Sequence, residues 1–324
     1  MSENRPPMRY WRKNDFGAIT GNIPMSLIPF DDRDGSIWFN GELIPWRDAK
    51  LHVLTHAVHY ASSVFEGERV YSGHIFKSRE HTERLHASAG VLDFEIPYTV
   101  EEIDAAKRQV LDSMGIVDGY IRPVAWRGSE MMGVSAQQNR INLAIAAWEW
   151  PSYFDPEAKT KGINLEMSKW RRPAPDSAPT NAKAAGLYMI CTLSKHAAEK
   201  NGFHDAMMLD YRGLVAEATG ANVFFVMSDG RIHTPTPDCF LDGITRRTVI
   251  DLAKARGYEI VERQIKPEEM ADASECFLTG TAAEVTPVGR IGDYTFTPAE
   301  VCATLADDYT KLVNSPPAEA QAAE

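Results

Sequence analysis

Apolar positions in the first half of the chain fall into short alternating segments that are separated by turn dipeptides. "IWFNGELI" (37–44) and "VFEGERVYSGHIF" (64–76) each carry apolar residues on both sides of a turn pair, "NG" and "SG" respectively. Such pairs favour tight hairpins. "GYIRPVAWRG" (119–128) and "NLAIAAWEW" (142–150) are typical of two longer strands. These segments together predict an antiparallel sheet.

Two segments between these strands have helical spacing. In "HTERLHASAGVL" (81–92), Leu85, Ala89 and Leu92 recur on one helical face. "TVEEIDAAKRQVLDSMG" (99–115) opens with Thr99 three residues before Glu102, which is a capping box, and closes on a C-terminal glycine. We therefore expect an α+β domain over 36–149, with the helices on one face of its sheet.

The periodicity breaks at "WPSYFDPEAKTKG" (150–162), whose two prolines indicate an interdomain loop. A larger domain is expected over 163–314. Residues 1–35 are predicted to form an irregular extension, and 315–324 a disordered tail of low complexity. Within the larger domain the pattern predicts strands at 163–170, 205–210, 222–227 and 274–279, and helices at 184–201, 244–256 and 298–313.

Composition and charge exclude several classes of protein. The 324 residues are 44% hydrophobic and 24% charged, as in ordinary globular proteins. No apolar run approaches the ~18 residues of a membrane span, and the first residues lack the apolar region of a signal peptide. The net charge of −11 argues against nucleic-acid binding. Four cysteines without a CxxC pair indicate reduced thiols, and hence a cytoplasmic protein.

Three charged residues stand in unusual surroundings. Lys183 lies among alanines and a glycine in "PTNAKAAGLY", which suggests either an exposed helix start or an amine with room for a bulky group bonded to it. Glu217, in "VAEATGAN", lies among small and apolar residues. If buried, it needs an arginine or a protonated ring nitrogen as partner. Arg84, in "EHTERL", suits a surface helix or an anion site.

Two turns and a group of histidines are further candidates. "DGITRRT" (242–248) places a glycine and hydroxyls at an expected helix start, which suits either a plain cap or a phosphate. "LTGTAAEVTP" (278–287) offers a second turn of small residues whose amides could bind an anion. His52, His56 and His59 have metal-like spacing but no HExxH pattern, so structural roles are favoured and no metal is predicted.

Taken together, these weak signals supply what pyridoxal phosphate needs. The cofactor requires a lysine for a Schiff base, an acid at its pyridine nitrogen, a donor at its phenolate and a phosphate cup. The chain resembles the class IV aminotransferases of fold type IV, and most closely the branched-chain amino acid aminotransferases. The resemblance runs from "IWFNGELIPWRDAKLHVLTHAVHYASSVFEGERVY" (37–71) to "TGTAAEVTPV" (279–288).

The resemblance implies two domains, a small N-terminal one and a larger one with a β-barrel-like core. It implies that Lys183 bonds the cofactor and is the catalytic residue, that Tyr188 contacts the phenolate, and that Glu217 pairs with the pyridine nitrogen. The full set of cofactor-binding residues that it implies is Arg84, Lys183, Tyr188, Glu217, Leu241, Gly243, Ile244, Thr245 and Thr281.

The resemblance also implies a substrate pocket that accepts branched aliphatic side chains and the distal carboxylate of glutamate. Arg122 of "YIRP" would receive that carboxylate, and "MMGVS" (131–135) would reach the neighbouring subunit's pocket. The implied substrate-binding residues are Tyr60, Phe65, Gly67, Tyr120, Arg122, Met132, Val134, Trp150, Tyr153, Thr281 and Ala282.

The activity implied is transfer of the amino group of L-leucine, L-isoleucine or L-valine to 2-oxoglutarate, with ping-pong kinetics, in a homodimer or higher oligomer. The chain departs from the family pattern at Ala221 and Asp242, where a glutamate and a proline are usual. Three relatives of the same fold stay open as alternatives: a D-amino acid transaminase, an (R)-amine transaminase and an aminodeoxychorismate lyase.

Overall fold

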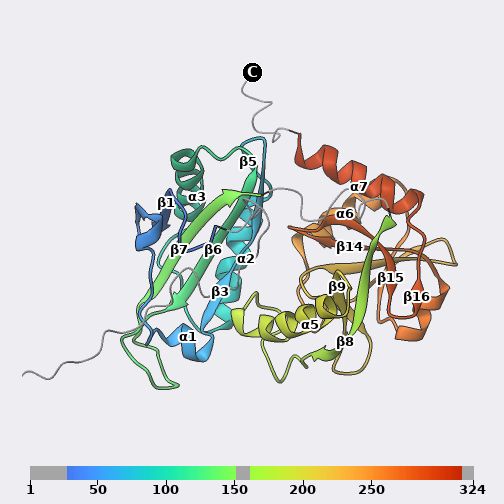
Figure 1. Cartoon of the computed structure of the whole chain (residues 1–324), viewed down its shortest axis with the longest axis horizontal. Helices are drawn as coiled ribbons and strands as arrows, with labels where there is room; N and C mark the ends of the chain where they lie inside the picture. The colour runs from blue at the N-terminus through green and yellow to red at the C-terminus, as the bar shows by residue number, and fades with distance from the viewer. Residues whose placement is uncertain (1–27, 151–160, 316–324) are drawn as a thin grey trace, which may run out of the picture.

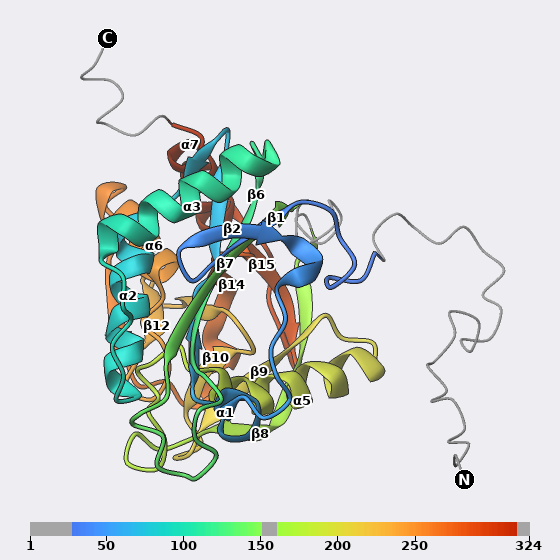
Figure 2. The same ribbon diagram turned by 90° about the vertical axis from the view of Figure 1, so that its left-hand side faces the viewer.

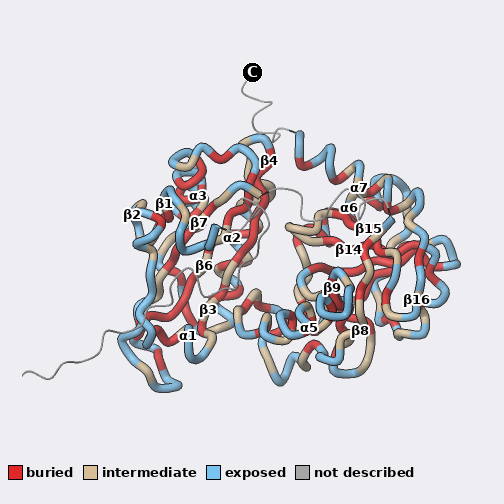
Figure 3. Tube along the Cα trace, viewed as in Figure 1, coloured by how far each residue is buried: buried red, intermediate tan, exposed pale blue. Residues whose placement is uncertain are grey.

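A computed structural model describes residues 28–150 and 161–315, which form two lobes side by side (Figure 1). A seven-stranded sheet organises the first lobe and a nine-stranded sheet the second. In both lobes the buried residues run along the central strands, while exposed residues lie on the outer helices and loops (Figure 3). None of the described helices is long and apolar enough to cross a membrane.

The sheet of the first lobe has the strand order β2-β1-β7-β6-β4-β5, with β3 paired to β6. Helices α2 and α3 cover one face of this sheet (Figure 2). Their apolar residues, such as Leu85 of α2 and Ile103 of α3, pack against Ile121 and Leu143 of the sheet. The elements of this lobe are β1 (Ser36–Phe39), β2 (Glu42–Pro45), α1 (His56–Tyr60), β3 (Ser63–Phe65), β4 (Glu68–Tyr71), β5 (His74–Ile75), α2 (Ser78–Val91), α3 (Val100–Met114), β6 (Gly119–Arg127) and β7 (Ile141–Glu149).

Both predicted hairpin turns are confirmed. Asn40 and Gly41 have positive φ, as do Ser72 and Gly73, and this is the backbone that two-residue hairpins require. The Thr99–Glu102 capping box starts α3, and Gly115 ends it in the left-handed conformation. The 64–76 segment differs in one respect, because the chain leaves the sheet at Glu66 and Gly67 before β4 begins.

The second lobe contains a closed barrel, which confirms the expected barrel-like core. Strands β10, β9, β8, β15, β14 and β11 pair in turn, and β11 pairs back to β10. Its interior is apolar, with Ile163, Met207, Val223 and Leu278 fully buried or nearly so. The elements of this lobe are β8 (Ile163–Arg172), α5 (Tyr188–Lys200), β9 (Asp205–Asp210), β10 (Val215–Ala218), β11 (Asn222–Met227), β12 (Ile232–Pro235), α6 (Ile244–Ala255), β13 (Ile260–Arg263), β14 (Ala273–Gly280), β15 (Glu284–Ile291), β16 (Tyr294–Thr295) and α7 (Glu300–Val313), with short 3-10 turns at Trp46–Asp48, Ala185–Leu187 and Pro267–Asp272.

The helix expected at 184–201 begins later than predicted. Lys183 is outside any helix, Ala184 is extended, and Ala185–Leu187 form a 3-10 turn before α5 starts at Tyr188. The cause is a contact with the first lobe, because the Phe65 amide donates to the Lys183 carbonyl over 3.2 Å and Val64 bridges to Ala184. The lysine is therefore held by both lobes and not by a helix.

The structure describes the residues of the two expected domains but not most of the segments that border them. The two sheets fall within 36–149 and 163–314, as expected. Most of the extension, most of the interdomain loop and nearly all of the tail lie outside the described residues.

Candidate active site

A cavity between the lobes gathers the residues predicted to bind the cofactor. Its empty space is about 570 Å³, including the open mouth. All nine predicted residues line it. The lining consists of Arg84, Arg172, Ala182, Lys183, Leu187, Tyr188, Glu217, Thr219, Gly220, Ala221, Asn222, Leu241, Gly243, Ile244, Thr245, Thr279, Gly280 and Thr281.

Lys183 is half-buried and faces this cavity. Its Nζ donates to the Tyr188 hydroxyl over 2.8 Å, and its backbone amide donates to Ser88 Oγ over 3.0 Å. Burial favours the neutral amine, but Tyr188 and Glu66 outweigh it and raise the pKa of Lys183 above its ordinary value. Since only a neutral amine attacks an aldehyde, covalent attachment should become faster as the pH rises.

The small residues around Lys183 lie in two different environments. Ala182 lines the cavity, as predicted for a residue that leaves room for the cofactor. Ala184 instead is buried against β3, and a Cβ on Gly186 would lie 3.1 Å from Ala61 Cβ. Ala184 and Gly186 thus let the two lobes approach each other closely.

Glu217 lies buried on β10 at another wall of the cavity. Arg172 Nε lies 3.4 Å from its Oε1, and Asn222 Nδ2 donates to its Oε2 over 3.2 Å. Burial raises the pKa of Glu217 to about 7, against the opposing charges of Arg172 and Lys183. A carboxyl group with this pKa suits a protonated ring nitrogen, whose charge would favour the ionised form.

Arg172 and Asn222 had no local signal in the sequence. Arg172 stands at the end of β8, is almost fully buried, and also donates to Cys191 Sγ over 3.4 Å. Burial lowers the pKa of Arg172, but Glu217 and Cys191 raise it by more, so its pKa lies above the ordinary value. Both candidate partners of Glu217, an arginine and a ring nitrogen, are thus compatible with the site.

The start of α6 forms one end of the cavity. Its N-cap, Gly243, contributes no capping side chain, so the first amides of the helix face the cavity without one. Close packing explains the glycine, because a Cβ there would lie 2.3 Å from Asn222 Oδ1. Thr279 adds a buried hydroxyl without a hydrogen-bond partner among the described residues. These donors suit a phosphate.

Asp242, an acidic residue beside this helix start, does not line the cavity. Its carboxylate pairs with Arg246 over 2.9 Å and with Arg247 over 3.4 Å. The departure from the family's proline therefore leaves the anion site free of an unpaired negative charge.

Arg84 reaches the cavity from α2 and is held by a buried acid. Its Nε and Nη2 donate to the two carboxylate oxygens of Glu66 over 2.7 and 2.9 Å, and His81 Nδ1 lies 2.7 Å from Oε2. Burial alone would raise the pKa of Glu66, but the charges of Arg84 and His81 lower it well below its ordinary value. Glu66 was not predicted, although it lies between two predicted residues.

Five of the predicted substrate residues form one cluster beside Lys183. The Phe65 ring lies 4.8 Å from the Tyr188 ring, with Lys183 Nζ 5.0 Å from its centroid. Arg122 Cζ lies 4.7 Å from the same ring, and Arg122 Nη2 donates to the Tyr120 hydroxyl over 3.1 Å. The other members, Gly67 and Trp150, both contact Tyr120.

Gly67 is required by the position of Tyr120, because a Cβ on Gly67 would lie 1.7 Å from the Tyr120 hydroxyl. We expect Gly67→Ala to displace this hydroxyl and to raise the KM for amino acid substrates about five- to tenfold, as expected for the loss of one hydrogen bond. The visible absorption of the bound cofactor should not change. Gly90→Ala is the matched control, since a Cβ at Gly90 meets nothing within 4 Å. A KM equal to that of the wild type would contradict this account.

The remaining predicted substrate residues lie elsewhere. Ala282 follows Thr281 in the turn beside the cavity. Tyr60 is exposed and stacks on His56 at 4.5 Å. Met132 and Val134 lie in the loop before β7, outside the cavity lining, and Val134 is 83% exposed. Tyr153 lies outside the described residues.

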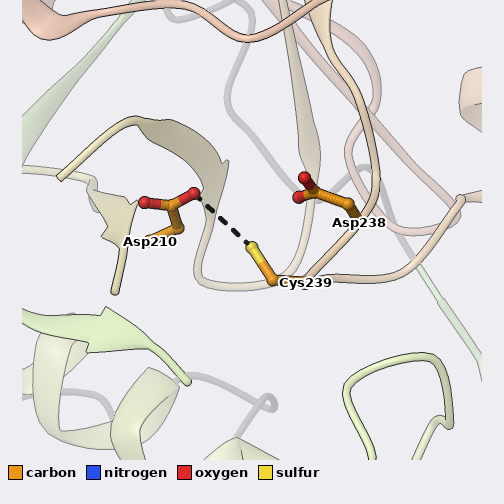
Figure 4. A group of neighbouring side chains, drawn as sticks. All are labelled: Asp210, Asp238 and Cys239. Carbon is orange, nitrogen blue, oxygen red and sulfur yellow. Dashed lines mark hydrogen bonds between the residues drawn. The ribbon is translucent and has the colours of Figure 1, made fainter. Parts of the chain in front are cut away.

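The histidines do not form a metal site in the described part of the chain. His56 bonds to Ser62 Oγ and to the Gly133 carbonyl, while His59 bonds to the Val53 carbonyl. One other group, Asp210, Asp238 and Cys239, has ligand atoms close together (Figure 4).

That acidic group already holds a cation of the protein itself. Arg212 Nη2 lies 2.6 Å from Asp210 and 2.8 Å from Asp238. Burial and the two carboxylates raise the pKa of Cys239 to about 12, so its thiol stays protonated. The group is therefore a structural ion pair.

The donor set of the cavity fits pyridoxal phosphate. It offers an amine for the aldehyde, a phenol beside that amine, a buried carboxyl group for the ring nitrogen, and a cup of free amides, hydroxyls and Arg84 for the phosphate. The roles of the individual residues stay predictions.

Comparisons with known proteins agree with this fit. The model of the family "Amino-transferase class IV" matches residues 63–291. The "Probable branched-chain-amino-acid aminotransferase" of Rickettsia felis is 42% identical over 293 residues, which cover 89% of this chain and 99% of the relative. The branched-chain-amino-acid aminotransferase of Pseudomonas aeruginosa is 43% identical over 264 residues, covering 80% and 86%.

Solved structures have the same fold. A branched-chain amino acid aminotransferase from T.th., solved with pyridoxamine 5'-phosphate, superposes with a TM-score of 0.85 at 40% identity, covering 89% of this chain and 97% of that one. Together with the cavity, these matches show that the chain belongs to the class IV aminotransferases, as a pyridoxal-phosphate-dependent member of the branched-chain-amino-acid aminotransferase family.

Proposed function

We propose that the protein transfers the amino group of L-leucine, L-isoleucine or L-valine to 2-oxoglutarate, giving a branched-chain 2-oxo acid and L-glutamate. The observation that carries the proposal is that Lys183 and Arg122 both lie against the Phe65 ring. Lys183 Nζ and Arg122 Cζ are each about 5 Å from the ring centroid. An apolar ring beside the reacting amine suits an aliphatic side chain, and an arginine at its edge suits the second carboxylate of glutamate. The names of the relatives support the same substrates.

Arg122 has a free donor for such a carboxylate. Its Nη2 is engaged with Tyr120, whereas its buried Nε has no hydrogen-bond partner among the described residues. A buried donor without a partner is unfavourable, so a bound carboxylate would satisfy it. The side chain of leucine has no group that could make this bond.

The residues of the chain divide the chemistry between them. Lys183 would hold the cofactor through its Nζ, and the same amine, once free, would act as the base that moves the proton of the substrate Cα. Tyr188, whose hydroxyl lies 2.8 Å from that Nζ, would orient the amine and donate to the phenolate. Glu217 would keep a proton on the ring nitrogen, and Arg84 with the start of α6 would hold the phosphate.

When bound, pyridoxal phosphate supplies a conjugated, positively charged ring that withdraws electrons from the substrate Cα. Because Lys183 performs the same proton transfers in both directions, it serves the amino acid and the 2-oxo acid in turn. This alternation gives ping-pong kinetics.

A substrate panel tests the proposal. With 2-oxoglutarate as acceptor, we expect L-leucine, L-isoleucine and L-valine to be turned over much faster than D-alanine or an (R)-amine. Aminodeoxychorismate should release no pyruvate. Preference for D-alanine or the amine, or release of pyruvate, would assign the protein to one of those other activities of the fold.

Arg122 is expected to separate the two substrate classes. Arg122→Ala should raise the KM for L-glutamate and 2-oxoglutarate by about 10²-fold, as for loss of a buried charge-assisted bond, and that for L-leucine much less. Steady-state kinetics with each substrate measures this split. Arg140→Ala, at an exposed loop arginine, is the control. Equal losses on both substrates would refute the role of Arg122.

We further propose a homodimer or higher homo-oligomer. An apolar groove lined by residues that include Leu51, Val58 and Arg122 lies on the outside of the first lobe. Leu51, Val53 and Val58 are each at least half exposed, and such patches favour association. A partner subunit bound in this groove would cover Arg122 and so complete the wall of the substrate pocket there. Met132 and Val134 are proposed to reach that partner's pocket, and light scattering of the purified protein tests the assembly.

A cytoplasmic location is also proposed. It is supported by the four cysteines, which are all buried and unpaired.

A further inference from the structure

The hairpin between β14 and β15 has a backbone conformation that the sequence does not predict, because a glutamate there has positive φ. Residues 281–283 link the two strands, and Gly280 pairs with Glu284 across the hairpin. In the proposed function, on which this inference rests, Thr281 and Ala282 of this turn bind the carboxylate on the substrate's Cα. The turn must therefore keep its shape when the site is empty and when it is filled.

Glu284, the first residue of β15, follows this turn with a left-handed backbone, at φ of 54°. Glycine or asparagine is preferred in that conformation. A glutamate in this conformation is strained. Its side chain must therefore make contacts that offset the strain.

Those contacts come from the other lobe. The Tyr71 hydroxyl donates to Glu284 Oε1 over 2.8 Å, and Arg69 Nη1 lies 3.8 Å from the same oxygen. Both residues belong to β4, and both are buried. The carboxylate of Glu284 thus ties the turn of one lobe to a strand of the other.

The anchor lies beside a buried apolar cluster. Tyr71 and Tyr309 of α7 both belong to it, and the Phe76 ring contacts both, with centroids 6.5 Å and 5.8 Å away respectively. The cluster also includes Val249 and Ile250 of α6, the helix that begins at the cavity. Tyr71 therefore sits in a packed environment that holds its ring in place.

We infer that Glu284 is a positioning residue, which holds the Thr281–Ala282 turn in shape for the substrate carboxylate through Tyr71 and Arg69. These contacts join the two lobes beside the turn.

Tyr71→Phe and Glu284→Gly test this inference together. Phenylalanine removes one hydrogen bond and leaves the strained glutamate in place. Glycine removes the anchor and relieves the strain at the same time, because glycine adopts positive φ freely. For both variants we expect KM to rise about five- to tenfold with kcat within about twofold of the wild type. The amino acid used should be the one that the wild type turns over best.

A binding measurement without turnover gives the second readout. The probe is the carboxylic acid that has the same side chain as that amino acid and no amino group, which for leucine is 4-methylvaleric acid. Its Kd, from titration of the holoenzyme, should rise by the same factor in both variants. The cofactor's visible absorption should be unchanged. Tyr211→Phe, at an exposed tyrosine, is the matched control.

The outcomes are separable from those of the proposed function. Failure of wild-type protein to use branched-chain amino acids would overturn the proposed substrates, whereas the ratio of variant to wild type tests Glu284 with any amino acid. Wild-type affinity in Glu284→Gly would show that the backbone needs no anchor, and would overturn the inference. So would a loss confined to kcat or to cofactor absorption.

Discussion

Lys183→Ala is expected to abolish steady turnover and the visible absorption of the lysine-bound cofactor. The substitution removes the Nζ that lies 2.8 Å from the Tyr188 hydroxyl in the cavity. General acid–base catalysis alone is worth about 10²–10⁴-fold, and the covalent link to the cofactor is lost as well. Spectra and leucine turnover of the purified variant measure both effects.

Two controls keep this result specific. Lys200→Ala, at an exposed lysine at the end of α5, should retain spectrum and activity. Reduction of the wild-type protein with borohydride should fix the cofactor on residue 183, as peptide mapping would locate it. A variant at Lys183 that keeps both turnover and the visible band would refute its assignment as the catalytic amine.

Glu217→Gln is expected to lower kcat by about 10²–10³-fold, the usual cost of removing one group that stabilises charge in the transition state. An amide cannot hold a proton on the ring nitrogen as a carboxylate does. Glu42→Gln, at an exposed position of β2, is the control, and kcat with L-leucine is the measurement. Activity within about twofold of the wild type would show that the ring does not depend on Glu217.

Glu217→Gln should stabilise the folded protein when the cofactor is absent. In the cofactor-free chain the pKa of Glu217 is raised from 4.5 to about 7 by burial. Between these pH values the folded state holds a proton that the unfolded state has lost, so stability falls as the pH rises from about 4.5 to about 7. Glutamine does not ionise, so the variant does not lose stability in this way as the pH rises. Its unfolding temperature at pH 8 should exceed that of the wild type by at least about 2 °C, and a lower value would contradict the buried-acid account.

Several of the cofactor residues that the resemblance implies lie in short segments with a local signal of their own. A lysine among alanines, a glutamate among apolar residues and a glycine before a helix are visible without coordinates. The structure brings all nine into one cavity. The hairpins at Asn40–Gly41 and Ser72–Gly73 were predictable for the same reason, since turn chemistry is local.

What the sequence could not supply depends on contacts between distant segments. Arg172 becomes a partner of Glu217 only when β8 and β10 enter the same barrel. Tyr71 and Glu284 are 213 residues apart. The late start of α5 has a similar cause, because the Lys183 carbonyl accepts a hydrogen bond from Phe65 of the other lobe, which a helical pattern cannot reveal.

The substrate residues that the resemblance implies do not all lie together. Phe65, Gly67, Tyr120, Arg122 and Trp150 contact one another within one chain. Met132 and Val134 lie outside the cavity lining, and their predicted role requires a second subunit. Their contribution therefore remains tied to the proposed assembly.

The most direct test of the account follows the absorption of the purified protein through its two half-reactions. Excess L-leucine without an acceptor is predicted to remove the visible band and to release one 2-oxo acid per site. Addition of 2-oxoglutarate after removal of leucine is predicted to restore the band and to release L-glutamate. A band that resists L-leucine, L-isoleucine and L-valine, but is removed by D-alanine or an (R)-amine, would contradict the proposed function.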